Sequence, residues 1–378
     1  MKKSAISNVS YATPLGEANL KVLLYFENQK LIAKSGIGRA MRLQQEALAP
    51  IEDVEVTTDP KCTDYDILHI NTYGVKSMYM VKKAHKMGKK VVYHAHSTYE
   101  DFRNSFFASN LIAPLYKKYL VALYGQADAL ITPTPYSKSL LENYGLTQPI
   151  YPVSNGIRLS KYANDPKKIQ AYKDYFDIQP GQKVVMSVGL FFERKGIFDF
   201  VELAKRHPEV TFIWFGHTNP AILPRKIRRV VFGGEHPKNL IFPGYLSGDV
   251  ILGAFAGADL FLYPSYEETE GIVVLEALAS KQRLLVRDIP VYDSWLKDGV
   301  NSYKAEDLED FDRQMVAILA GEKSDLTQAG FQVAQERDLN RVGEILAEVY
   351  QAVLENRALS FNADQDGALV PAWSTNRS

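Results

Sequence analysis

The chain has 378 residues, 46% of them hydrophobic and 23% charged, so it can bury the cores of two ordinary domains. Its formal net charge is zero, which argues against a nucleic-acid partner. The only cysteine, Cys62, excludes an intrachain disulfide and fits a reducing cytoplasm. No apolar run approaches the roughly 20 residues of a membrane-spanning helix. Any membrane contact is therefore expected to be peripheral, on the cytoplasmic face.

Short apolar runs alternate with longer helical stretches along the chain. After residues 1–19, which we expect to be a flexible leader, these runs are Leu20–Phe26, Ile67–Ile70, Val91–His94, Ala129–Thr132, Val184–Val188, Phe212–Phe215, Leu260–Tyr263 and Leu284–Val286. Nearly continuous apolar strands separated by helices indicate parallel sheets covered on both faces. The pattern predicts an α/β protein of doubly wound, Rossmann-like type.

A polar stretch over residues 158–182 divides this pattern into two halves. We predict an N-terminal domain over 20–157 and a C-terminal domain over 158–330. A helix over 331–357 is expected to return to the first domain, and 358–378 is expected to be a disordered tail. Ligands of doubly wound sheets bind at the carboxyl ends of the strands, so two facing edges would form an interdomain cleft.

A segment with two glycines, Ser35-Gly36-Ile37-Gly38-Arg39, follows the first strand after a short loop and opens a helix. Gly36 and Gly38 would let the backbone approach a ligand closely. The segment lacks the third glycine of a dinucleotide-binding loop. An ordinary loop followed by a helix start is therefore an equal alternative.

Two histidines lie at the end of the run Val91–His94. Strand alternation puts His94 and His96 on one face, with His96 nearer the carboxyl edge. We expect His96 to face the cleft and His94 to be a buried structural residue. No metal site is expected, because no matching Cys or His cluster accompanies them.

A basic stretch over residues 75–90 contains no acidic residue. Near an anionic bilayer each of its lysines could contribute about 1 kcal/mol. The next region, 102–124, is rich in apolar residues and could lie in the membrane interface. The expected membrane or acceptor contacts are Lys82, Lys83, Lys86, Phe106, Phe107 and Leu111. Alternatively, both helices pack on the sheet and their lysines are merely solvated.

The second half opens on Val184–Val188, followed by Gly189 and the pair Arg194-Lys195 before a helix. Cations in this position could meet a diphosphate, with the helix dipole behind them. A solvated pair on a surface loop is the alternative. Further ligand contacts are expected at the ends of the next strands, from Gly216 and Tyr245, although a plain loop is equally plausible at Tyr245.

The most informative segment runs from Pro264 to Leu278. Glu268 lies in the turn after a strand, and Glu276 lies in the helix that follows. A carboxylate at such a junction can accept hydrogen bonds from sugar hydroxyls, and the helix N-terminus presents free N–H groups to an anion. Between them lie three more expected contacts, Thr269, Gly271 and Ile272. The segment could thus hold a sugar nucleotide.

Together these segments resemble glycosyltransferase family 4, retaining enzymes with two facing Rossmann-like domains (the GT-B type). The resemblance implies that Glu268 contacts the donor sugar and Glu276 the ribose. It also implies that Arg194 and Lys195 neutralise the departing diphosphate. His96 would lie near the transferred sugar, and the 36–38 loop beside the phosphates. The chain departs from the family at Leu190, where many members carry Arg, and at Thr269-Glu270, which replace Gly-Phe.

Within the family, the chain is similar to bacterial enzymes that build diglycosyl-diacylglycerol. This resemblance rests on His96–Phe102, Gly36–Arg39 and Glu268–Val274. It implies transfer from UDP-galactose or UDP-glucose to glucosyl-diacylglycerol at an anionic membrane surface, and the product would be the glycolipid anchor of lipoteichoic acid. No metal or other cofactor is expected. The alternatives are a soluble family 4 enzyme acting on a sugar or polysaccharide, an inactive sugar-nucleotide-binding paralogue and, least supported, an oxidoreductase.

Overall fold

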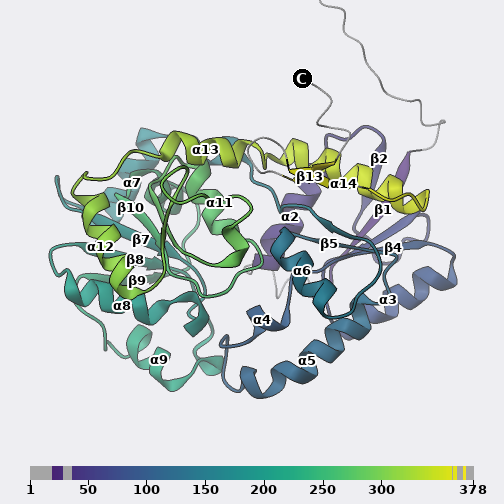
Figure 1. Cartoon of the computed structure of the whole chain (residues 1–378), viewed down its shortest axis with the longest axis horizontal. Helices are drawn as coiled ribbons and strands as arrows, with labels where there is room; N and C mark the ends of the chain where they lie inside the picture. Colours follow the sequence, from purple (N-terminus) through teal and green to yellow (C-terminus); the bar gives the residue numbers. More distant parts are fainter. Residues whose placement is uncertain (1–18, 29–35, 360, 364–368, 372–378) are drawn as a thin grey trace, which may run out of the picture.

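The computed structural model describes residues 19–28, 36–359, 361–363 and 369–371. In these residues two six-stranded parallel sheets lie beside each other, each flanked by helices (Figure 1). The predicted α/β architecture of two doubly wound domains is confirmed. The expected leader lies outside the described residues, apart from residue 19.

The N-terminal sheet has the strand order β2-β1-β3-β4-β5-β6. Its strands are β1 (Leu20–Tyr25), β2 (Val54–Thr57), β3 (Ile67–Ile70), β4 (Lys90–His94), β5 (Ala129–Thr132) and β6 (Ile150–Pro152). Its helices are α2 (Gly36–Leu48), α3 (Val75–Lys86), α4 (Tyr99–Phe102), α5 (Ser109–Tyr124) and α6 (Pro135–Asn143). Separate apolar clusters fill the two faces, one with α2 and one with α3 and α5.

The C-terminal sheet has the order β12-β11-β10-β7-β8-β9. Its strands are β7 (Val184–Val188), β8 (Thr211–Phe215), β9 (Leu240–Gly244), β10 (Leu260–Tyr263), β11 (Leu284–Arg287) and β12 (Tyr303–Ala305). Its α-helices are α7 (Pro166–Phe176), α8 (Ile197–Arg206), α9 (Arg225–Phe232), α10 (Asp249–Gly257), α11 (Ile272–Ala279), α12 (Leu308–Leu319) and α13 (Thr327–Gln335). The 3₁₀ turns are η1 (Leu159–Tyr162), η2 (Glu193–Lys195), η3 (Pro220–Ile222) and η4 (Pro290–Tyr292).

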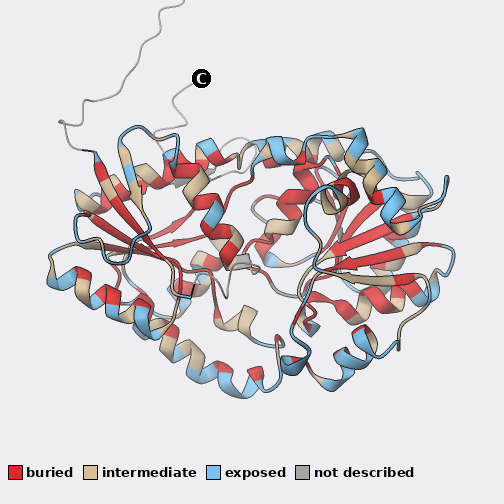
Figure 2. Ribbon diagram, turned by 180° about the vertical axis from the view of Figure 1, so that it is seen from behind, coloured by how far each residue is buried: buried red, intermediate tan, exposed pale blue. Residues whose placement is uncertain are grey.

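All eight predicted strands are present, and the other four strands of the two six-stranded sheets, β2, β6, β9 and β12, are the outermost ones. Edge strands are covered on fewer sides, so their sequences need not be continuously apolar. Strand β2 has no buried residue and β9 has one, whereas every residue of β3 and β10 is buried. Figure 2 shows the buried residues concentrated along the sheets and the inward faces of the helices.

The C-terminal end of the chain differs from the expectation in two ways. The single helix expected over 331–357 is divided into α13 and α14 (Leu339–Leu354), with a break at 336–338. Helix α14 packs on α2 and joins the apolar cluster of the N-terminal domain. In the expected disordered tail, β13 (Phe361–Ala363) and β14 (Leu369–Pro371) pair antiparallel, so regular structure is present in those six residues.

None of the helices in the described residues combines the length and apolar composition needed to cross a bilayer.

Candidate active site

A buried ion pair between Lys195 and Glu268 forms the centre of the candidate site. The Lys195 ammonium donates to Glu268 Oε1, and the Tyr263 hydroxyl lies 2.9 Å from Lys195 Nζ. Tyr263 and Ser265 also donate to the same carboxylate oxygen, at 2.6 and 2.7 Å. Within the described part of the chain Glu268 Oε2 has no hydrogen bond, so this oxygen can accept donors from a ligand.

A glycine brings the two segments of this site together. Gly196 has φ +76° and begins α8 directly after Lys195. A Cβ at this position would lie 2.2 Å from the carbonyl oxygen of Pro264, in the loop that carries Glu268. Only a residue without a side chain permits this approach and this backbone conformation.

Burial and charge act in opposite directions on this pair. Burial lowers the pKa of Lys195 to about 8, against the attraction of Glu268. Burial alone would raise the pKa of Glu268, but Lys195, Arg194 and the hydrogen bonds outweigh it and lower that pKa. Both groups are therefore charged at neutral pH.

Arg194 connects the two domains. Its Nε donates to Ser105 Oγ of the N-terminal domain at 2.8 Å, and its Nη1 donates to the carbonyl of Glu267 at 3.0 Å. Its backbone N–H donates to the carbonyl of Asn104 at 3.2 Å. Nearby, burial raises the pKa of Asp101 in α4, while the charges of Arg194 and Lys195 act to lower it. The cations thus lie where both domains meet.

The loop between β10 and α11, residues 264–271, is bonded to the N-terminal domain at several points. The Thr134 hydroxyl donates to the carbonyl of Thr269 at 2.9 Å. The Tyr136 hydroxyl donates to Glu267 at 3.0 Å. Burial raises the pKa of Glu267 to about 7, although this hydrogen bond opposes the shift. We call residues 264–271 the carboxylate loop.

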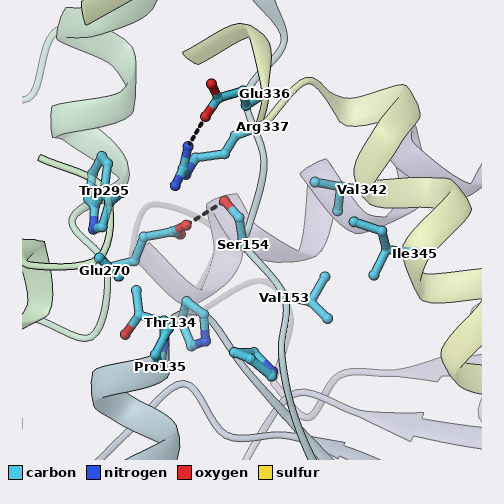
Figure 3. A pocket seen from close by; sticks show the side chains of 13 residues that line it. Thr134, Pro135, Val153, Ser154, Glu270, Trp295, Glu336, Arg337, Val342 and Ile345 are labelled. Carbon is cyan, nitrogen blue, oxygen red and sulfur yellow. Dashed lines mark hydrogen bonds and ion pairs between the residues drawn. The ribbon is translucent and has the colours of Figure 1, made fainter. Parts of the chain in front are cut away.

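Glu270 binds the carboxylate loop to the linker between the domains. It accepts a hydrogen bond from the Ser154 hydroxyl (Figure 3). It also accepts two from Asn155, whose backbone N and Nδ2 lie 3.1 and 2.6 Å from Glu270 Oε2. The adjoining cavity, of about 40 Å³, also contacts Trp295 and Arg337. Ligand pockets typically measure about 300–1,000 Å³, so this cavity is a packing gap at the hinge.

Glu276, the second expected carboxylate, is 2% exposed and bonded to the opposite domain. Arg39 Nη1 lies 2.6 Å and the Tyr162 hydroxyl 2.5 Å from the same oxygen, Oε1. The Glu276 charge raises the pKa of Arg39 against the effect of burial, and Tyr162 and Tyr245 add to the rise. Thus Glu276 and Tyr245 lie close to Arg39, which stands in the first turn of α2, the helix that Gly36 and Gly38 open.

The strand-end glycines of the C-terminal domain contact each other. Gly216 has φ +151°, and a Cβ there would lie 1.9 Å from the carbonyl oxygen of Gly189. A Cβ on Gly189 would lie 4.0 Å from Lys195 Cγ. Gly271 has φ +86° and begins α11, whose Ile272 packs against the apolar cluster of the N-terminal domain. Gly189 therefore lies beside Lys195, Gly216 lies beside Gly189, and Ile272 lies at the domain boundary.

His96 is less accessible than expected. It is 9% exposed, its Nε2 lies 2.8 Å from Asn71 Oδ1, and its ring stacks on His94 with centroids 4.0 Å apart. Burial lowers its pKa to about 3, so the imidazole is neutral. Among the described residues it has no direct contact with Lys195 or Glu268. The structure therefore does not bring His96 into the bonded group.

The expected membrane contacts divide into exposed and packed residues. On α3, Lys82 and Lys86 are exposed and Lys83 is half-buried. Phe107 and Leu111 are 76% and 84% exposed, and α5 also exposes Ile112 and Leu115, two more apolar residues of the 102–124 region. Phe106 is half-buried, and its ring packs edge-on against Phe102, with centroids 5.0 Å apart, so it is less accessible than Phe107.

Several residues at the boundary were not selected from the sequence. Arg39 directly follows Gly38, and its position at the start of a helix could have indicated a site residue. Asp101 lies in the segment His96–Phe102, but the sequence predicted no function for it. Tyr162 lies in the polar linker and Ser105 in a loop, and neither carries a local sequence signal. In the described residues no group of three or more His, Cys, Asp or Glu side chains could hold a metal ion.

Comparisons with known proteins bear on this arrangement. Residues 55–161 match the model of Glycosyltransferase Family 4, and residues 168–330 match that of Glycosyl transferases group 1. The chain is 44% identical over 337 residues to a processive diacylglycerol alpha-glucosyltransferase of Acholeplasma laidlawii, covering 89% of this chain and 99% of that protein. The chain belongs to glycosyltransferase family 4.

More distant relatives of this glycosyltransferase agree with the assignment. It is 25% identical to an alpha-galactosylglucosyldiacylglycerol synthase of Streptococcus pneumoniae, over 72% of this chain and 74% of that protein. Among solved structures, sucrose-phosphate synthase from Thermosynechococcus elongatus has a TM-score of 0.75 at 15% identity, covering 89% and 100% of the two chains. Anabaena HepE in complex with UDP-glucose has a TM-score of 0.67 at 18% identity, covering 88% and 100%. The predicted GT-B fold is confirmed.

Proposed function

We propose that the chain is a retaining hexosyltransferase that moves glucose from UDP-glucose to glucosyl-diacylglycerol, making diglucosyl-diacylglycerol. The observation that carries this proposal is the 44% identity to a diacylglycerol alpha-glucosyltransferase over nearly the full length of both proteins. Galactose from UDP-galactose is the second candidate donor sugar, supported by the galactosylglucosyldiacylglycerol synthase at 25% identity.

Considering the described residues alone, each of the two carboxylates keeps one oxygen without a hydrogen bond, as an acceptor that a sugar nucleotide can use. Glu268 uses one oxygen for Lys195 and leaves Oε2 for donor-sugar hydroxyls. Glu276 uses Oε1 for Arg39 and Tyr162, and its Oε2, which has no hydrogen bond to any residue that the structure describes, is proposed to meet the ribose. Gly189, Gly216 and Tyr245 directly follow β7, β8 and β9, and the diphosphate and base are proposed to lie along these strand ends.

Catalysis in this proposal rests on position and charge. The acceptor hydroxyl attacks C1 on the face from which the diphosphate leaves, so the anomeric configuration is kept. The C1–O bond to the phosphate breaks as the new C1–O bond forms, and the departing phosphate oxygen takes the hydroxyl proton. Arg194 and Lys195 stabilise the charge of the leaving group. These cations and the α11 N-terminus supply positive charge at the site, so the proposal requires no metal.

The acceptor is proposed to be reached at the cytoplasmic face of the membrane, with the protein associated peripherally. The exposed lysines of α3 suit anionic headgroups, and the exposed side chains of α5 suit the interface below them. A side chain such as Leu111, which is 84% exposed, gains nothing from folding and gains from burial in lipid.

Mass spectrometry of reaction products tests this function. The purified protein is offered UDP-glucose or UDP-galactose, together with diacylglycerol, glucosyl-diacylglycerol or free glucose in detergent micelles. We expect a diglucosyl lipid from UDP-glucose and glucosyl-diacylglycerol, and much less of this product from Glu268→Gln. Products carrying three or more hexoses would indicate repeated addition, as the name of the Acholeplasma laidlawii relative describes for that protein. Transfer only to free sugar, or hydrolysis alone, would contradict the lipid acceptor.

A further inference from the structure

The solvent-exposed helix α9 of the C-terminal domain concentrates positive charge that the site described above does not use. Four of its eight residues are basic and exposed, namely Arg225, Lys226, Arg228 and Arg229. The segment 220–234 contains no acidic residue. The buried residues Ile227 and Val231 fix the inward face, so the basic side chains lie on the outward face.

These charges are mostly unpaired within the protein. Arg229 forms an ion pair with Glu235 at 2.5 Å. Arg225, Lys226 and Arg228 form no ion pair with any residue that the structure describes. Like charges one turn apart on a helix repel and lower its stability slightly. Folding therefore does not account for this cluster, and an external anionic partner would.

Helix α9 is connected to the exposed part of α5 across the domain boundary. The Phe107 N–H, just before α5, donates to the carbonyl of Ile222, just before α9, at 3.1 Å. Ile222 and Phe232 are 45% and 49% exposed, beside Phe107 at 76%. Figure 1 shows α5 and α9 along the same lower edge of the molecule, and Figure 2 shows that edge exposed.

We propose that η3 and α9 form, together with α5, one docking surface for an anionic lipid bilayer that spans both domains. This inference rests on the proposed function, because only a membrane acceptor requires such a surface. Exposed apolar side chains interleaved with cations suit a bilayer, where the apolar groups enter the interface and the cations meet headgroups. The face is continuous with the expected contacts on α5. Membrane binding would then engage both domains at once and hold them in one orientation.

Vesicle sedimentation of a charge-reversed protein tests the proposal. Arg225→Glu/Lys226→Glu changes two unpaired cations in the first turn of α9, where the helix dipole favours acidic residues, so folding is not impaired. The matched control is Lys167→Glu/Lys168→Glu, with the same charge change in the first turn of α7, on the opposite edge in Figure 1. Each cation near an anionic surface is worth about fivefold in binding, about 1 kcal/mol.

The full chain is mixed with phosphatidylglycerol-containing vesicles or with pure phosphatidylcholine vesicles at low salt. We expect the α9 variant to bind the anionic vesicles at least about 20-fold more weakly than wild type, and the α7 variant to bind like wild type. High salt should remove the difference, since it screens exposed charge. UDP affinity and thermal stability should be unchanged in both variants.

Equal vesicle binding by the α9 variant and wild type would overturn the inference, as would equal losses in both variants. Absence of wild-type binding to vesicles of either composition would also overturn it. The micellar product assay is independent of vesicle charge. If that assay gives the lipid product but the α9 variant binds vesicles like wild type, the docking surface is contradicted and the proposed function is not. Failure of that assay would remove the proposed function itself.

Discussion

The carboxylate loop and the surface of α5 lie at the same domain boundary but are built in opposite ways. Glu268 is 7% exposed, and one of its oxygens receives Lys195, Tyr263 and Ser265. Leu111 on α5 is 84% exposed. Fixed, desolvated charge suits a reaction that needs a set geometry. Exposed apolar surface suits a fluid partner such as a bilayer. Sugar transfer from the donor should therefore be sensitive to the loss of a single charged or hydrogen-bonding group. Access of the lipid acceptor should instead depend on the overall composition of the exposed surface.

Among the variants that test this difference, removal of the Lys195 ammonium should have the largest effect on turnover and stability. Lys195→Ala is expected to lower kcat by about 10²–10³-fold, as loss of a charge-stabilising donor does elsewhere. It also leaves Glu268 buried without its ion-pair partner, which is expected to lower the free energy of unfolding by about 3–5 kcal/mol. Steady-state UDP release and urea denaturation measure the two effects.

Two further variants separate charge from folding. Lys195→Met/Glu268→Gln removes both charges and should regain much of the stability while remaining inactive. Arg194→Ala affects a half-buried side chain, so turnover should fall sharply while folding persists. Wild-type turnover in Lys195→Ala or Arg194→Ala would contradict the role of that cation.

The next largest effect is expected in the dependence of turnover on pH. Because burial lowers the pKa of Lys195 to about 8, the ammonium loses its proton as pH rises through that value. Turnover is expected to decline above it, about tenfold per pH unit once the neutral form predominates. Glu268 favours the charged ammonium, so Glu268→Gln should move the decline to lower pH. A turnover rate that does not change up to pH 10 would show that the Lys195 charge is not needed.

The Arg39–Glu276 pair should contribute a smaller effect, limited to donor binding. Arg39→Ala is expected to weaken UDP binding about tenfold, since a hydrogen bond to a charged group is worth about 1.5–3 kcal/mol. If Arg39 acts by orienting Glu276 toward the ribose, 2′,3′-dideoxy-UDP should bind wild type and variant alike. Calorimetry with both nucleotides measures this. An equal loss for the two nucleotides would show that Arg39 does not act through the ribose.

The predictable part of the fold and the site has a physical basis. Strands such as β3 and β10 are buried on both faces, so their residues are apolar throughout and visible in sequence. Glu268 and Lys195 stand at strand–loop–helix junctions, where the chain itself sets their position.

Contacts between distant segments were not predictable. The bonds from Tyr162 and Arg39 to Glu276 join residues 114 and 237 positions apart. No periodicity or spacing encodes such a pair. The same limit applies to Phe106, which is half-buried with its ring against Phe102 of α4, whereas its neighbour Phe107 is 76% exposed.

The smallest effect is expected on the lipid-facing side. Leu111→Ser/Leu115→Ser changes two side chains that are 84% and 71% exposed, so stability should stay within about 0.5 kcal/mol of wild type. The KM for glucosyl-diacylglycerol in vesicles should rise about fivefold, by loss of apolar area in the interface, while the KM for UDP-glucose is unchanged. An unchanged KM for the lipid acceptor would show that the exposed side chains of α5 play no part in binding it.

The configuration of the newly formed glycosidic bond tests the central claim most directly. The lipid made from UDP-glucose and glucosyl-diacylglycerol is purified, and its anomeric proton coupling is measured by NMR spectroscopy. Attack from the face that the diphosphate leaves, assisted by Arg194 and Lys195, predicts a second sugar in α linkage, as in the donor. A β-linked second sugar, or glucose recovered only in the aqueous phase, would contradict the account.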